Sequence, residues 1–388
     1  MKLSEKIKKI APSATLEITS KAKALRASGE DVVILAAGEP DFDTPQIIKD
    51  AALKALDSGY TKYTPAAGSV SLKKAICQKL KKDNGLEYSP NEVIVSNGAK
   101  HSIYNILQVL CSDGDEVLII PPFWLSYPEM VKLAGATPVK LSMRKDNFFK
   151  VDPNDLERAI TSKTRVLILN SPSNPTGVIY DKDELKAIAE ICVKNKIMII
   201  SDEIYEKIIF DGNEHFSIAE VSPEAKEATI VINGVSKSHS MTGWRIGYAA
   251  GDKDVIKLAS TLQSHATSGP CSISQVAAEC AILSDLEDVM DKNRETFQQR
   301  RDVLIEGFSG EDKIKPFKPL GAFYLFCDIS KCGVDSMTFS KDLLEEKNVA
   351  VIPGGPFGDD SAVRISFATD IETIQMGIDR IKEWVKKF

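Results

Sequence analysis

Residues 229–245 of the chain read TIVINGVSKSHSMTGWR, an apolar run followed by a loop of small and hydroxyl residues. The run Thr229–Ile232 is rich in β-branched side chains and predicts a buried strand. Lys237 follows in the loop, where a partly desolvated amine would have a lowered pKa and could attack a carbonyl carbon. Arg245, eight residues further on, can hold a phosphate through two hydrogen bonds. An isolated loop lysine is more often simply exposed to solvent, so this interpretation depends on the rest of the chain.

A second apolar run ends in a carboxylate. Residues 198–205 read MIISDEIY and place Asp202 at the end of a predicted strand, with Tyr205 three residues later. A buried carboxylate is costly without a cationic partner, and a pyridinium nitrogen would be such a partner. The alternative is an aspartate that caps the next helix.

Polar or aromatic residues also follow three other predicted strands. Asn174 lies in the turn 170–177, NSPSNPTG, and its amide can be directed into a cleft, although turn formation alone explains such a residue. Residues 96–100, SNGAK, connect a strand to a helix, and backbone N–H groups at such a helix start can bind an anion. Trp124 can stack on a flat ring or fill a gap between loops.

The order of the predicted elements indicates an α/β fold. From about residue 46, short apolar runs alternate with helical patterns, which is typical of a mostly parallel sheet with helices on both faces. The predicted strands are Val93–Ser96, Glu116–Ile120, Thr137–Lys140, Val166–Leu169, Ile197–Ser201, Thr229–Ile232 and Ile246–Ala250. The predicted helices between them include Ala99–Leu110, Tyr127–Ala134, Lys182–Lys194 and Asp254–Thr261. Ligands of open α/β sheets bind beyond the carboxyl ends of the strands, where the candidate residues lie.

The chain is expected to form two domains, because 388 residues exceed what one hydrophobic core usually supports. Beyond Leu286 a long charged helix leads into a smaller α+β unit. Its predicted elements are the helix 286–308, the strand Phe323–Phe326, the helix Met337–Lys347, the strands Val349–Ile352 and Val363–Ser366, and a final helix that runs to Phe388. We predict a large domain of residues 46–290 and a small domain formed by residues 1–45 together with 291–388.

The composition argues against several classes of protein. A net charge of -6 does not fit a general nucleic-acid or membrane-surface binder, which needs a basic face. The seven cysteines and four histidines are scattered, with no C-x-x-C pair, so no metal site is expected. The chain has no apolar run long enough to cross a bilayer and no secretory signal after Met1–Lys9. A soluble, cytoplasmic protein is therefore expected.

Taken together, these motifs resemble the class I/II aminotransferases, which are enzymes of fold type I that bind pyridoxal 5'-phosphate (PLP). The resemblance covers essentially the whole chain and depends most on the order and spacing of Asp202, Tyr205, Lys237 and Arg245. The segments 38–42, GEPDF, and 174–177, NPTG, strengthen it. It implies a large domain built on a mostly parallel seven-stranded sheet between helices, plus a smaller α+β domain. A dinucleotide-binding fold is not expected, because no G-x-G-x-x-G follows the first strand.

The resemblance implies a role in cofactor binding for several residues. Lys237 would hold PLP as a Schiff base and move a proton during the reaction, and Asp202 would pair with the protonated ring nitrogen. Asn174 and Tyr205 would bind the phenolic oxygen of the cofactor, and Trp124 would stack on its ring. The residues implied in phosphate binding are Gly98, Ala99, Lys100, Ser236 and Arg245.

Other implied roles concern the substrate and a second subunit. Arg364 matches the arginine that binds the substrate α-carboxylate, and the Gly38 backbone would lie against the same group, with Trp124 and Asn174 also beside the substrate. Tyr63 matches a tyrosine that reaches the phosphate in the neighbouring subunit. The resemblance therefore implies a homodimer with shared active sites. Its substrates would be small molecules, an amino acid and a 2-oxo acid.

The choice of substrate is only partly indicated. One subgroup of aspartate aminotransferases binds the distal carboxylate with an arginine from the partner, just after the segment that is 255–262 here. This chain has no Arg or Lys between Lys257 and Lys292. Residues 12–15, PSAT, together with Lys100, instead resemble bacterial-type aspartate aminotransferases that often also accept prephenate. We therefore expect Lys100 and Thr15 to bind a second carboxylate, with aspartate, glutamate and prephenate as candidate substrates.

Three alternatives stay open at this stage. Lys100 could face solvent in an enzyme that prefers aromatic or neutral amino acids. The same cofactor site could serve a β-lyase, because the orientation of the substrate around Cα decides the reaction type. A regulator that senses PLP without turnover is the third, but such proteins carry a DNA-binding domain, for which no residues remain here. We expect His239 to contribute only to local packing.

Overall fold

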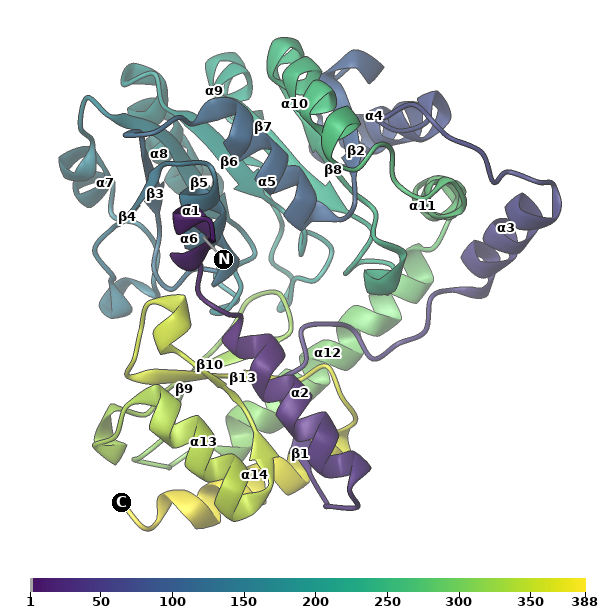
Figure 1. Ribbon diagram of the computed structural model, residues 1–388. Helices are drawn as coiled ribbons and strands as arrows, with labels where there is room; N and C mark the ends of the chain where they lie inside the picture. The colour runs from purple at the N-terminus through teal and green to yellow at the C-terminus, as the bar shows by residue number, and fades with distance from the viewer. Residues whose placement is uncertain (1–2) are drawn as a thin grey trace.

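A seven-stranded sheet forms the centre of the larger part of the protein in the computed structural model, which describes residues 3–388 (Figure 1). Its order is β2-β8-β7-β6-β5-β3-β4, and only the pairs that involve β8 are antiparallel. The strands are β2 (Val93–Ser96), β3 (Glu116–Ile119), β4 (Thr137–Lys140), β5 (Thr164–Asn170), β6 (Met198–Asp202), β7 (Thr229–Gly234) and β8 (Gly247–Ala250). Every strand predicted for this sheet is present, β2 and β4 with the predicted ends and the other five with slightly different ends, and the predicted α/β class is confirmed.

The central strands carry apolar side chains on both faces, as a sheet covered by helices on both sides requires. In β7, Ile230 and Ile232 pack into one core and Val231 into another, as the alternation of side chains along a strand requires. The first core includes α5 (Ala99–Leu110), α6 (Ser126–Leu133) and α10 (Lys253–Ala266). The opposite face is covered by α4 (Val70–Asn84), α8 (Lys182–Lys194) and α11 (Ser272–Leu283). The shorter helices α7 (Pro153–Ala159) and α9 (Pro223–Ala228) complete this part.

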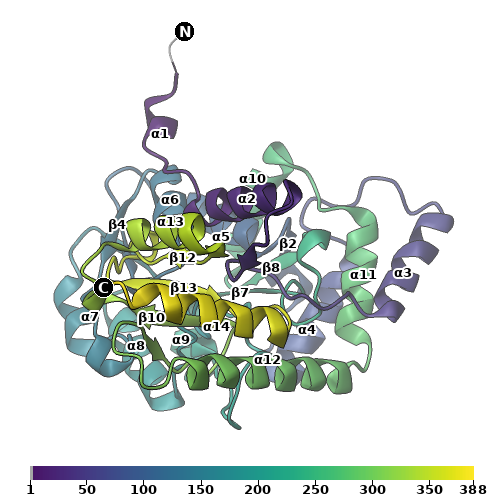
Figure 2. The same cartoon turned by 90° about the horizontal axis from the view of Figure 1, so that it is seen from below.

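A four-stranded antiparallel sheet lies below the first sheet in Figure 1, in the order β12-β13-β10-β9. Its strands are β9 (Lys315–Phe317), β10 (Tyr324–Asp328), β12 (Ile352–Pro353) and β13 (Ala362–Ser366). The helices around it are α12 (Glu287–Gly307), α13 (Ser336–Lys347) and α14 (Ile371–Val385). Figure 2 shows α12 and α14 lying side by side.

The N-terminal segment packs with this second part of the protein. β1 (Val33–Ile34) pairs in parallel with β11 (Val349–Ala350), and α2 (Ala14–Ala27) contacts β11 and β12. The single strand predicted at 349–352 is therefore two strands, because β11 pairs with β1 whereas Ile352 pairs with Arg364 of β13. Helices α1 (Glu5–Lys8) and α3 (Gln46–Asp57) flank this segment along the chain.

The predicted domain boundaries at residues 46 and 290 remain a prediction, and Met1 and Lys2 of the predicted small domain lie outside the described residues. Among residues 3–388, no helix combines the length and the apolar character that a membrane crossing requires.

Candidate active site

A cavity of about 470 Å³ lies where the carboxyl ends of β5, β6 and β7 face the second sheet. Parallel strands place their carboxyl ends at the same edge, so residues distant in sequence meet there. The predicted site residues that line the cavity are Thr15, Gly38, Ala99, Lys100, Trp124, Asn174, Asp202, Tyr205, Ser236, Lys237, Arg245 and Arg364. The structure thus brings together almost the whole predicted set.

Lys237 projects from the loop after β7 and is largely enclosed by aromatic side chains. Its Nζ donates a hydrogen bond to the Gly38 carbonyl oxygen at 2.6 Å and lies 5.9 Å from the ring centre of Tyr205 and 5.7 Å from that of Phe323. Burial lowers the pKa of Lys237 to about 8, and the nearby Arg364 also lowers it. A substantial fraction of this amine is therefore neutral near physiological pH, which a nucleophile towards a carbonyl group requires.

Asp202 ends β6 as a buried carboxylate. It accepts hydrogen bonds from the Tyr127 hydroxyl at 2.7 Å and from the Ile204 N–H at 3.3 Å. Burial raises the pKa of Asp202 to about 6, against the effect of the Tyr127 hydrogen bond. Within residues 3–388, no lysine or arginine forms an ion pair with it. A carboxylate in this state fits the protonated nitrogen of a heteroaromatic ring.

Arg364, in β13, is a buried guanidinium without a carboxylate partner among the described residues. It donates to the Asn174 side-chain oxygen at 3.0 Å and to the Ala36 carbonyl at 3.1 Å, and its Nε has no hydrogen-bond partner. The guanidinium also stacks 4.2 Å from the ring centre of Tyr324. Burial lowers its pKa, so the charged form is costly here and gains from binding a carboxylate.

A candidate phosphate site lies where α5 begins. Gly98 precedes the helix with φ +87°, and a Cβ atom at this position would lie 2.5 Å from Nη2 of Arg245. Arg245 itself donates to the carbonyl oxygens of Thr242 at 2.8 Å and Asn97 at 3.2 Å. A guanidinium beside the N–H groups of a helix start is suited to a phosphate dianion, and the buried Ser236 lies on the same cavity wall.

Lys100, Thr15 and Thr19 also line the cavity. Lys100 Nζ lies 4.8 Å from the ring centre of Trp124, and Trp124 packs edge-on against Tyr127 with ring centres 5.4 Å apart. The Thr15 hydroxyl is buried and makes no hydrogen bond with any described residue, and the same holds for Thr19 one turn further along α2. The cavity lining therefore includes one ammonium and two free hydroxyl groups that a polar ligand could contact.

Tyr63 and His239 lie away from the cavity. Tyr63, between α3 and α4, is 99% exposed. The ring of His239 is hydrogen-bonded to the Ser238 hydroxyl at 2.7 Å, and burial lowers its pKa to about 4. The prediction of a packing role for His239 agrees with this position.

Three residues at the cavity were not found from the sequence. Tyr127 binds Asp202, Tyr324 shares a hydrogen bond of 3.0 Å with Tyr205, and Glu39 accepts a hydrogen bond from Thr242. Tyr127 could have been noticed because it lies one helical turn after Trp124. Glu39 lies in the segment 38–42 that strengthened the resemblance, although no role was expected for its side chain, and the sequence around Tyr324 carried no comparable signal.

Comparisons with known proteins point in one direction. A model of the family described as aminotransferase class I and II matches residues 30–381. The chain is 51% identical to an aspartate aminotransferase of Bacillus sp. (strain YM-2), over 99% of each chain. It is 44% identical to an aspartate/prephenate aminotransferase of Cereibacter sphaeroides, over 98% of each. The solved structure of an aspartate aminotransferase from Thermus thermophilus with maleate matches with a TM-score of 0.95 and 41% identity, over 99% of each chain.

Proposed function

The chain belongs to the class I and II aminotransferases, and from this premise we propose that it transfers the amino group of aspartate or glutamate to a 2-oxo acid by means of PLP. We further propose prephenate as an additional acceptor. One observation carries the proposal. An amine of lowered pKa (Lys237), a carboxylate without a cation (Asp202) and a guanidinium without an anion (Arg364) line the same cavity.

PLP, when bound, supplies an electron-poor ring that stabilises negative charge on the substrate Cα. In our proposal Asp202 stays ionised and holds the ring nitrogen in its protonated form, while the Tyr127 hydroxyl fixes the carboxylate. Arg245, Ser236 and the N–H groups at the start of α5 would hold the phosphate. Tyr205 and Asn174 would bind the phenolic oxygen, and Trp124 would pack against the ring.

Arg364 orients the substrate. Its two terminal nitrogens can bind the α-carboxylate as a fork, and Asn174 and Tyr324 already hold the guanidinium in place. With the carboxylate fixed there, the substrate Cα would lie in the same cavity as Lys237. The Lys237 amine would act as the general base that accepts the Cα proton and, as an ammonium group, as the acid that returns it.

The preference for a second carboxylate rests on Lys100 and Thr15. The Lys100 ammonium lies over the Trp124 ring, and the Thr15 hydroxyl, on α2, lines the same cavity. A charged group with a hydroxyl beside it favours a carboxylate over an apolar side chain. The names of the relatives support the same choice, because each is an aspartate or aspartate/prephenate aminotransferase.

We also propose that the enzyme is a homodimer in which Tyr63 reaches the phosphate bound in the partner subunit. An aromatic side chain that is 99% exposed fits such a role better than a role in its own chain. Leu53, Leu56 and Tyr60 lie near it along the chain and are exposed as well, at 57%, 50% and 40%.

The test is a half-reaction followed by absorbance. PLP-loaded enzyme is mixed, without any oxo acid, with aspartate, glutamate, alanine, phenylalanine or lysine in turn. We expect the two acidic donors to convert the cofactor to its amino form fastest, and Lys100→Ala to lower kcat/KM for aspartate about tenfold while that for alanine changes little. A fastest rate with phenylalanine would remove the acidic preference. Release of pyruvate together with free ammonia from a donor with a leaving group on Cβ, such as cysteine, would indicate a lyase instead.

A further inference from the structure

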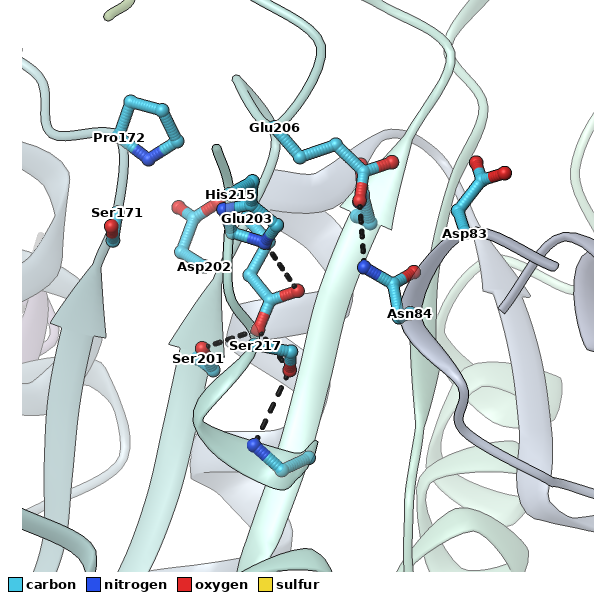
Figure 3. A network of polar contacts seen from close by, with 12 residues as sticks. Asp83, Asn84, Ser171, Pro172, Ser201, Asp202, Glu203, Glu206, His215 and Ser217 are labelled. Carbon is cyan, nitrogen blue, oxygen red and sulfur yellow. Dashed lines mark hydrogen bonds and ion pairs between the residues drawn. The ribbon is translucent and has the colours of Figure 1, made fainter. Parts of the chain in front are cut away.

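The turn after β6 has two buried faces. Asp202 and Tyr205 line the active-site cavity, whereas Glu203 and Glu206 lie on the other face, where they are only 1% and 9% exposed. Figure 3 shows the side chains of Asp202 and Glu203 directed to opposite sides. Two ionisable carboxylates therefore lie directly behind the proposed cofactor contacts, and no step described above uses them.

Glu203 is bound by three donors. The hydroxyl groups of Ser201 and Ser217 each lie 2.7 Å from Oε1, and His215 Nε2 lies 3.2 Å from Oε2 (Figure 3). Nδ1 of His215 is buried without a partner. Burial opposes the charge on His215, but the hydrogen bond and charge of Glu203 outweigh it and raise the pKa of His215.

Glu206 connects the same cluster to α4. Its carboxylate contacts the Lys79 ammonium and accepts a hydrogen bond from Asn84 at 3.3 Å. Burial alone would raise its pKa, but Lys79 and His215 lower it to about 2. Single ligand atoms of Glu203, Glu206 and His215 all lie within 4.8 Å of one another. The Lys79 ammonium already supplies the cation that a metal ion would provide.

The cluster is close to neutral when His215 is protonated, with two carboxylates facing one imidazolium and one ammonium. Its Glu206 end also lines a second cavity of about 470 Å³, which gives it access to solvent. Burial is the largest influence that raises the pKa of Asp202, and the charge of Glu203 raises it further. The hydrogen bonds from Tyr127 and Ile204 lower it. The other titratable groups near the cluster are Asp83, Tyr88, Lys207, Glu220, His239 and Tyr248.

We propose that Glu203 and His215 are positioning residues, which fix the Asp202–Tyr205 turn from behind and set the electrostatic potential that a cofactor bound to Asp202 experiences. This inference rests on the proposed function, because it concerns PLP at that site. The proposal predicts that the two residues affect the bound cofactor in opposite directions. Loss of the negative charge of Glu203 and loss of the positive charge of His215 should change the protonation of the bound cofactor in opposite directions, although each breaks the same contact.

The experiment compares Glu203→Gln and His215→Gln with the wild-type holoenzyme. For each, the pH-dependent visible absorbance of bound PLP is titrated, and the Kd for PLP and the Tm of the apoprotein are measured. We expect the absorbance midpoint to move to lower pH in E203Q and to higher pH in H215Q, by on the order of 0.5 unit each. The double variant should return close to the wild-type midpoint.

Asp155→Asn is the matched control. Asp155, like Glu203, is a buried carboxylate with a basic partner, because it lies 2.8 Å from Arg144, but it belongs to α7. It should lower the Tm without moving the midpoint. Unchanged midpoints in both test variants, or shifts of the same sign, would overturn the proposal.

If neither variant folds, Ser217→Ala removes one donor to Glu203 and keeps both charges. It should move the midpoint to higher pH, and an unchanged midpoint would contradict the inference. A wild-type protein that does not bind PLP would instead refute the proposed function, so the two failures can be distinguished.

Discussion

At the scale of single residues, the burial of Lys237 lowers the free energy of unfolding of the apoprotein, and this loss can be measured. Its pKa of about 8 in the folded chain lies below the ordinary value of 10.5. Between these pH values the unfolded chain therefore binds more protons than the folded chain, so stability rises with pH in that range. The penalty is complete below pH 8 and disappears above pH 10.5.

Lys237→Met should therefore make the apoprotein more stable at pH 7, by roughly 1–2 kcal/mol after allowance for the lost hydrogen bond to Gly38. The gain should be lost by pH 10 and give way to a small loss of stability, because the missing hydrogen bond to Gly38 then outweighs what remains of the penalty, while the variant has no transaminase activity. Urea unfolding at the two pH values measures this. Lys163→Met, at an exposed position, is the control, and a gain in stability that did not depend on pH would contradict the argument.

A second residue-scale prediction concerns the hydroxyl that holds Asp202. Tyr127→Phe removes the hydrogen bond of 2.7 Å and leaves the ring in place, so the pKa of Asp202 should rise further. We expect affinity for PLP and kcat/KM each to fall about tenfold, since one hydrogen bond to a charged group is worth roughly 1.5 kcal/mol.

Tyr180→Phe provides the comparison, because the Tyr180 hydroxyl is also buried but accepts a hydrogen bond from the Val151 N–H away from the cavity. It should reduce the Tm and leave the Kd for PLP unchanged. Equal effects of the two variants on PLP binding would show that the Tyr127 hydroxyl has no special part in it.

At the scale of the secondary-structure element, the start of α5 is the feature most open to test. Gly98→Ala forces a side chain into a left-handed backbone conformation and towards the Arg245 guanidinium. We expect affinity for PLP to fall at least tenfold, measured by equilibrium dialysis.

Gly85→Ala at the end of α4 has a similar positive φ of +65° but open space around the new Cβ. It should cost about 1 kcal/mol of stability and leave PLP binding intact. If Gly98→Ala behaved in the same way, the α5 helix start would not be the phosphate site.

The elements also show what the sequence could predict. All seven strands of the main sheet were found, most of them because they are apolar runs that end at a polar loop, and the same pattern located Asp202 and Lys237. The division of residues 349–352 between two sheets was missed, because strand partners distant in sequence decide it. Tyr324 and the Glu203–His215 pair were missed for the same reason, since their roles arise from contacts between separate segments.

At the scale of the whole molecule, the proposed dimer predicts that Tyr63 acts on a site in another chain. Tyr63→Phe should weaken PLP binding several-fold without lowering the Tm, since the side chain is 99% exposed in its own subunit. The Kd for PLP should also depend on protein concentration near the dimer dissociation range, which sedimentation locates. Tyr60→Phe is the control, and a monomer that bound PLP with full affinity would contradict the dimer.

The pairing of β1 with β11 has a consequence for how the protein is made. The seven strands of the main sheet lie between residues 93 and 250, so this layer can assemble while the rest of the chain is still being synthesised. Val33 and Ile34 leave the ribosome early but must wait for Val349 and Ala350 before they can pair. Lys237 and the Gly98 helix start are therefore synthesised before Arg364, so most of the residues proposed to hold the cofactor are present in the nascent chain before the residue proposed to bind the substrate carboxylate.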